Sequence, residues 1–320
     1  LEQFGGLEQT RQSIIAQIES GNLDPAKIPA HLREEGKSLP PEVARQINKL
    51  PPETAAKVRQ FPVEMVKRWY SPRLYGHMFY PNALAGLILL LLPVALALLL
   101  GQGRGLALRR VLALGLAGIG LACLFWSGSK AGWLIALVLL GAWLLHFPFS
   151  IKLKIGLAGA AIGLGLIGFG VKYADYFDKG ATSVGARFGY WSAAGKTAME
   201  EPLLGTGPGT FKIAYQRHRD PGAEPTRLTH NDYLQQASDS GLPGFAMYLA
   251  FFGGATWVLA RRRLTEPIFV AMRLGLLAWL LQGVVEFGLY IPALAWPAWL
   301  MLGRLLAIPT NQFDKSGQTE

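Results

Sequence analysis

Cysteine and charge are both scarce in this sequence, and each scarcity narrows the kind of protein it encodes. One cysteine, Cys123, occurs among 320 residues. A single cysteine cannot form a disulfide within the chain and cannot build a cysteine-rich metal cluster. The patterns HExxH and GxSxG, typical of zinc proteases and serine hydrolases, are also absent. We therefore expect no metal and no cofactor.

The low charge content points to a membrane protein. Charged residues make up 16% of the chain and hydrophobic residues 51%, whereas soluble domains carry about 25% charged residues. The 38 glycines agree with this, because glycine is frequent in membrane helices. The net charge of +10 would suit a nucleic-acid partner, so the positions of the charges must decide between the two.

Seven apolar segments are long enough to cross a bilayer, because a spanning helix needs about 20 mostly apolar residues. They cover residues 82–100, 107–126, 131–147, 153–171, 243–260, 267–287 and 291–307. Pro93 and Pro297 lie inside two of them, where neighbouring helices can accommodate a kink. The sequence thus predicts an all-α fold, a polytopic membrane helical bundle with a large extracytoplasmic loop.

The short loops between these segments alternate in charge. Three of them hold eight basic residues (Arg104, Arg109, Arg110, Lys152, Lys154 and Arg261 to Arg263), whereas the short loops on the other side hold one, Lys130. Loops rich in Lys and Arg stay in the cytoplasm. Orientation therefore explains much of the net charge, and a nucleic-acid partner loses its main support.

This alternation divides the chain into five regions. They are an extracytoplasmic polar helical segment (1–80), four transmembrane helices (81–171), an extracytoplasmic loop expected to be catalytic (172–242), three transmembrane helices (243–307) and a cytoplasmic tail (308–320). The first region repeats an 11-residue pattern, LPPEVARQINK and LPPETAAKVRQ. Proline suits the first turn of a helix, so we expect short helices that begin at these prolines.

The stretch LTHNDYLQQASDSGLPG, residues 228–244, is polar but leads directly into an apolar segment. Thr229 with Asp232 three residues later resembles a helix capping box, and Gly241 suits the end of a short helix. His230 would then lie in the first turn, where the helix dipole disfavours the imidazolium form. A neutral imidazole can accept a proton. The alternative is a capped surface turn in which the histidine has no role.

Three other polar positions lie on the outer side. Arg187 precedes Tyr190 and Trp191 at helical spacing, so aromatic stacking could hold its guanidinium rigid for phosphate recognition. Lys130 in SGSKAG is either a binding cation or a snorkelling side chain. Glu286 lies four residues after Gln282, and an ionisable residue in such a segment is a functional candidate, or else an interfacial carboxylate. GTGPG, residues 205–209, lacks the Lys-Ser/Thr of a phosphate loop and indicates a glycine turn.

Taken in order, five motifs resemble a known family. They are YPNALAGLILLLLP, SGSKAG, RFGYWSAAGKTAMEEPLLGTGPGTFKIAY, HNDYLQQASDSGLPGF and EFGLYIPA, over about residues 74–307. The chain resembles the superfamily of O-antigen ligases and O-antigen polymerases, the bacterial lipid-linked glycan transferases. Leu1 is not an initiator methionine, and we expect a fragment that lacks the family's N-terminal spans.

The resemblance implies a metal-independent, inverting glycosyltransferase of lipopolysaccharide biosynthesis in the inner membrane. It would move a glycan from undecaprenyl diphosphate to an acceptor at the periplasmic face. His230 would act on the acceptor, while Arg187 and Lys130 would bind the diphosphate. Lys130 stands where the family has an arginine, so the bidentate geometry is lost there. Supporting candidates within the motifs are Asn231, Tyr233, Gln235, Trp191, Asn82 and Glu286.

The motifs do not distinguish between three kinds of acceptor. The acceptor could be the lipid A core, as for a ligase, a growing glycan, as for a polymerase, or a protein, as for an O-oligosaccharyltransferase. A bicarbonate or other solute transporter is a more distant alternative. A transporter should place polar residues near the bilayer midplane, whereas here they gather at the outer edge.

The orientation can be tested by chemical labelling. With residues 1–80 and 172–242 outside, cysteine introduced at Ser20 or Ala223 should react with a membrane-impermeant thiol reagent in intact cells whose outer membrane has been made permeable. Protection of both positions would reverse the orientation.

Overall fold

A computed structural model describes most of the chain. The described residues are 15–20, 41–61, 66, 73–74, 80–101, 105–144, 146, 149–178, 182–221, 223 and 225–308. The chain divides into two compact units, Leu1–Phe79 and Tyr80–Glu320. The predicted cytoplasmic tail lies outside the described residues except for Ile308.

The first unit contains the two helices that the repeated pattern predicted. Helix α2 covers Pro41–Ile47 and α3 covers Pro52–Arg59, so each begins at the second proline of its repeat. Ile47 and Val58 are buried together with Phe61 in a small core. The expectation of short helices with proline starts is confirmed.

The second unit is built from helices, and the described residues contain no strand. Its helices are α5 (Pro81–Leu100), α6 (Leu106–Ser127), α7 (Lys130–Leu144), α8 (Ile151–Asp178), α9 (Thr182–Glu200), α10 (Phe211–His218), α11 (Asp232–Arg261), α12 (Pro267–Gly283) and α13 (Pro292–Leu306), with a short 3-10 helix η5 (Gly288–Tyr290) before the last. This all-helical bundle confirms the predicted fold class.

Each of the seven predicted spans coincides with one of these helices. Four are long and apolar enough to cross a membrane, namely α5, α6, α8 and α11, while α7 and α12 are shorter apolar helices. Two predicted ends were wrong. Helix α8 continues to Asp178, and α12 stops at Gly283, so that Glu286 lies in the turn after the helix and not on its face.

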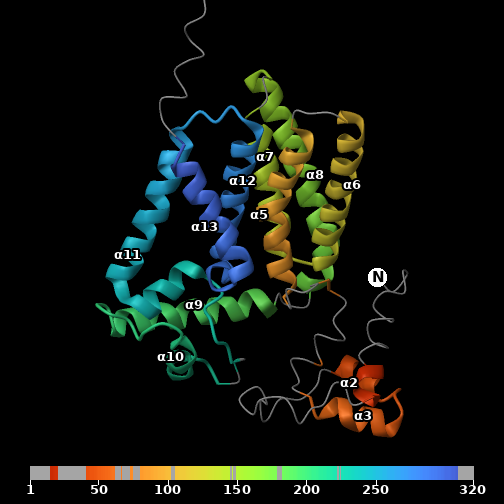
Figure 1. Cartoon of the computed structure of the whole chain (residues 1–320). Coiled ribbons are helices and arrows are strands. Elements are labelled where there is room, and N and C mark those ends of the chain that lie inside the picture. Colours follow the sequence, from red (N-terminus) through yellow and green to blue (C-terminus); the bar gives the residue numbers. More distant parts are fainter. Residues whose placement is uncertain are drawn as a thin grey trace, which may run out of the picture. The chain divides into compact units, whose positions relative to one another are not determined.

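Successive helices of the bundle run in alternate directions (Figure 1). The start of α5, the α6–α7 turn and the α12–α13 connection meet at one end, and α9 runs across this end (Figure 1). These are the segments that hold the polar motifs, so the fold brings them to one end of the bundle. Which side of the membrane this end faces remains a prediction.

Arg262 from a basic loop and Arg273 from α12 cap the opposite helix ends. Arg262 donates to the carbonyl oxygens of Leu305, Leu306 and Ile308, the first at 2.6 Å. Arg273 donates to the carbonyls of Leu259 and Arg262. A cation is stabilised at a helix C-terminus because the last carbonyl groups lack partners there. These arginines therefore stabilise this end of the bundle.

Helices α5 and α12 cross at two glycines. A side-chain carbon added at Gly275 would lie 2.2 Å from the carbonyl oxygen of Leu90, and one added at Gly86 would lie 2.1 Å from the amide oxygen of Gln282. Small residues allow close approach of membrane helices, whose association depends on packing because lipid is as apolar as their side chains. The two glycines thus set the distance between α5 and α12.

We expect Gly275→Ala to destabilise the bundle by about 1–3 kcal/mol, the usual cost of overpacking. Thermal unfolding in detergent would measure this. Gly159→Ala in α8 is the matched control, since no atom lies within 4 Å of the added carbon there. Equal melting temperatures for the two variants would show that the α5–α12 contact adapts freely.

Candidate active site

The polar stretch before α11 begins the helix differently from the prediction. Asn231 is the N-cap, because its side-chain oxygen accepts from the backbone N–H of Leu234 at 2.9 Å. Thr229 is occupied within its own turn, where its hydroxyl donates to the carbonyl of Asn231 at 2.7 Å. The predicted Thr229–Asp232 capping box is therefore wrong, and His230 precedes the helix instead of lying in its first turn.

His230 has a left-handed backbone conformation, with φ of 53°. Such values are uncommon outside glycine and are often found at functional sites. Two aromatic rings enclose the imidazole. Tyr190 is stacked on it with centroids 5.8 Å apart, and Phe287 meets it edge-on at 4.8 Å. The ring is thus fixed by its neighbours on both sides.

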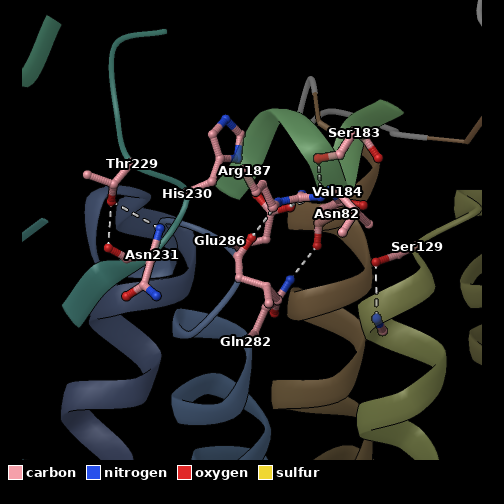
Figure 2. Close-up of polar contacts among 12 residues, drawn as sticks. Asn82, Ser129, Ser183, Val184, Arg187, Thr229, His230, Asn231, Gln282 and Glu286 are labelled. Atoms are coloured by element: carbon pink, nitrogen blue, oxygen red, sulfur yellow. Dashed lines mark hydrogen bonds and ion pairs between the residues drawn. The ribbon is translucent and has the colours of Figure 1, made fainter. Parts of the chain in front are cut away.

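Glu286 is the centre of the polar cluster (Figure 2). It is buried, and its Oε2 lies 3.2 Å from Nδ1 of His230. Its Oε1 accepts from Nη2 of Arg187 and from the side-chain amide of Asn82. Gln282 in turn donates to the carbonyl of Asn82 at 2.6 Å. The carboxylate therefore joins α5, α9, the segment before α11 and the turn after α12.

The contacts of Glu286 determine its charge. Burial alone would raise the pKa of Glu286, but the hydrogen bond with His230 and the charge of Arg187 outweigh it and hold the pKa below its ordinary value. An ionised carboxylate only accepts hydrogen bonds. In the neutral imidazole, Nδ1 of His230 must then carry the hydrogen, and Nε2 is left as the proton acceptor.

Three hydrogen bonds hold the guanidinium of Arg187. Besides Glu286, it donates from Nε to the carbonyl of Val285 at 3.1 Å and from Nη1 to that of Ser183 at 3.4 Å. Trp191 packs edge-on against Phe188. These three bonds use three of the five N–H groups of a guanidinium, so two are available for a ligand.

Lys130 is not part of the Glu286 cluster. Its ammonium group lies over the rings of Tyr176, 3.6 Å from the centroid, and Tyr173, at 5.0 Å. The hydroxyl of Tyr176 is 2.6 Å from the hydroxyl of Ser183. The backbone carbonyl of Ser183 accepts a hydrogen bond from Arg187. Lys130 is thus linked to Arg187 through two intermediate residues. Beside it, Ser129 caps α7 by accepting from the N–H of Gly132.

The other supporting candidates hold α11 in place. Tyr233 donates to the carbonyl of Leu280 at 3.0 Å. Gln235 accepts from the N–H of Thr229 and donates to Asp239. These contacts fix the segment that carries His230, so Tyr233 and Gln235 act on the site through the backbone.

The GTGPG segment is a glycine turn, as predicted. The N–H groups of Thr206 and Gly207 donate to the carbonyls of Ser238 and Asp239. Those carbonyls lie where α11 breaks at Gly241, whose backbone is not helical. The turn therefore satisfies the carbonyl groups left without partners at the predicted helix end.

Sequence reasoning missed the aromatic enclosure, the role of Ser183 and the contact between Gln282 and Asn82. Phe287 follows Glu286 directly and Tyr190 lies one turn after Arg187, so adjacency to candidate residues was the signal available. Ser183 and the contact between Gln282 and Asn82 had no local signal, because each bridges separate helices. Within the described ranges, no three His, Cys, Asp or Glu side chains gather to hold a metal ion.

One comparison with known proteins covers part of this site. Residues 115–249 match a family model described as O-antigen ligase. The match supports membership of the O-antigen ligase superfamily. No curated protein matches the chain.

The O-antigen ligase domain includes Lys130, Arg187 and His230, whereas Asn82 and Glu286 lie outside the matched residues. Together, the match and the apolar helices support a multi-pass membrane protein of a glycosyltransferase-like family. The pairing of His230 with Glu286 therefore joins the matched domain to the helices that follow it.

We expect Glu286→Gln to lower the stability of the fold by about 1–3 kcal/mol. The new NH₂ group would replace one carboxylate oxygen and point at a hydrogen-bond donor, which would leave that buried donor without an acceptor. Thermal unfolding in detergent would measure the loss. Glu266→Gln, at an exposed position before α12, is the matched control. An unchanged melting temperature for Glu286→Gln would show that the cluster does not depend on the carboxylate.

Proposed function

We propose that this chain transfers a glycan from an undecaprenyl-diphosphate carrier to an acceptor hydroxyl, at the periplasmic face of the bacterial inner membrane, as an O-antigen ligase does. The observation that carries the proposal is the contact between Nδ1 of His230 and the ionised Glu286. It leaves Nε2 of the histidine as a base for the acceptor. The O-antigen ligase match supports the choice of reaction.

In the proposed step His230 acts as a general base. The acceptor oxygen attacks the anomeric carbon of the sugar, and its proton passes to Nε2 of His230. The new carbon–oxygen bond forms as the bond between that carbon and the phosphate oxygen breaks, on the opposite face of the sugar. The electron pair stays with the diphosphate, and His230 later returns the proton to solvent. Because the base acts on one face of the sugar and the diphosphate leaves from the other, the configuration at the anomeric carbon is inverted.

Glu286 is suited to orient the base and not to replace it. Its two oxygens already accept from Arg187, Asn82 and His230, so its lone pairs face the protein. A carboxylate in this position holds the imidazole in one tautomer and stabilises the imidazolium that forms, as in the Ser-His-Asp triad. The rings of Tyr190 and Phe287 limit rotation of the imidazole.

Arg187 supplies positive charge for the leaving group. Charge grows on the diphosphate oxygens as the sugar leaves, and donors placed in advance stabilise it. The two remaining N–H groups of Arg187 suit phosphate oxygens, while its other three bonds keep the guanidinium in position. Lys130 adds a second cation farther along the same end of the bundle, without bidentate geometry.

We expect His230→Ala to lower transfer about 10²–10⁴-fold, the usual contribution of a positioned base, with little change in binding of the lipid diphosphate. His230→Gln should be nearly as slow, because an amide can keep the hydrogen bond to Glu286 but cannot take the proton. The measurement is glycan transfer from purified lipid-linked donor, with donor binding assayed separately.

The matched control is His218→Ala at the end of α10, where the imidazole contacts Glu200 3.1 Å away. It should transfer glycan at the parental rate. Parental turnover in His230→Ala would place the base elsewhere and leave the polar stretch as a capped turn.

A further inference from the structure

Three large apolar side chains are strongly exposed where α9 ends. Met199 is 72% exposed, Leu203 73% and Leu204 84%. They belong to the segment MEEPLL, and we call these three residues the apolar turn. Such exposure of neighbouring apolar side chains indicates a surface that meets lipid or another protein.

The apolar turn is fixed to the membrane helix α11. The N–H of Leu242 donates to the carbonyl of Pro202 at 2.7 Å. A side-chain carbon added at Gly241 would lie 2.7 Å from the backbone of Leu203, so the two backbones cross in direct contact. The apolar turn is therefore held at the break in α11 and cannot swing away from it.

Helix α11 continues from the same point with exposed apolar side chains. Leu242 and Met247 are exposed apolar residues in the next turns of the helix. Exposed apolar side chains on a membrane-spanning helix meet lipid tails, which are equally apolar. The apolar turn is thus bonded, at the backbone of Leu242, to a helix with apolar side chains exposed to lipid.

We propose that the apolar turn enters the bilayer interface beside α11 and anchors the α9–α10 segment on the membrane. Direct attachment of the turn to the apolar helix α11 favours lipid over a protein partner. Glu200 and Glu201, both exposed, directly precede Pro202. Charged side chains are costly in the hydrocarbon core, so these two limit how deeply the turn can enter the bilayer.

The anchor would set the height of the polar cluster above the lipid. Figure 1 shows α9 running across the helix ends, with α11 rising next to the end of α9 where the apolar turn begins. Arg187 lies on α9 and His230 lies just before α11, so both are attached to elements that meet at this turn. Lipid contact at this turn does not require that glycan transfer be the reaction.

The experiment places one fluorescent probe in the apolar turn and another at a polar control position. Leu204→Cys is made in a Cys123→Ser background, labelled with the NBD fluorophore and placed as the full chain in phosphatidylethanolamine–phosphatidylglycerol nanodiscs. Gln216→Cys, exposed on α10, is the control. We expect the probe at position 204 to emit at shorter wavelength and to be quenched by lipids spin-labelled near the headgroup. The control probe should be quenched by aqueous iodide instead.

A probe at position 204 that iodide quenches as strongly as the control would overturn the proposal and place the apolar turn in water. If Leu204→Cys does not fold, Met199→Cys is measured in the same way with the same expected result. Protection of the probe from both iodide and spin-labelled lipid would also contradict the proposal, because it would mean that protein covers the turn.

Discussion

The contact between Glu286 and its three donors is the interaction on which the candidate site depends. The carboxylate receives hydrogen bonds from Arg187 on α9, Asn82 on α5 and His230 before α11. None of these segments lies near another in sequence, and a buried carboxylate without such partners would be strongly unfavourable. If one donor is removed, the remaining two must offset the unfavourable burial of the carboxylate. The four segments are therefore stabilised together.

The close crossing of α5 and α12 makes this contact possible. Gly86 leaves room for the amide of Gln282, which holds the carbonyl of Asn82, the residue that binds Glu286. A larger side chain at Gly86 would displace Gln282 and, through it, Asn82. Packing within the bundle and the geometry of the polar cluster are therefore parts of the same constraint. At this crossing, glycine is required because a larger side chain would prevent the close approach of α5 and α12.

The fold was predictable from sequence because its main signals are long and repeated. Seven apolar segments and alternating loop charge defined the helices to within a few residues, except where α8 is longer and α12 shorter. A polar end such as YADYFD can continue a helix beyond the apolar run, since the hydrogen bonds of a helix do not depend on hydropathy. Apolar length therefore predicts the spans better than it predicts the ends of the helices.

The candidate site was only partly predictable, because its contacts join distant segments. His230, Arg187 and Glu286 could each be selected as polar residues in unusual places. Nothing in the local sequence indicates that Glu286 accepts hydrogen bonds from His230 and Arg187. Lys130 was grouped with Arg187 by charge and side, yet its ammonium group lies over Tyr176 and Tyr173. Charge alone does not show which partner a flexible lysine finds.

The correction at the start of α11 changes the physical basis for the role of His230. The sequence argument relied on the helix dipole, whose effect falls off beyond the first turn. His230 lies outside the helix, so its orientation depends on the left-handed backbone, the flanking rings and Glu286 instead. A histidine on the helix would have had its direction set by the helix itself. Placed before the cap, it can meet a carboxylate from another part of the chain, and its free nitrogen is turned away from that carboxylate. The tautomer that leaves Nε2 able to accept a proton is thus selected by a contact between two segments 56 residues apart.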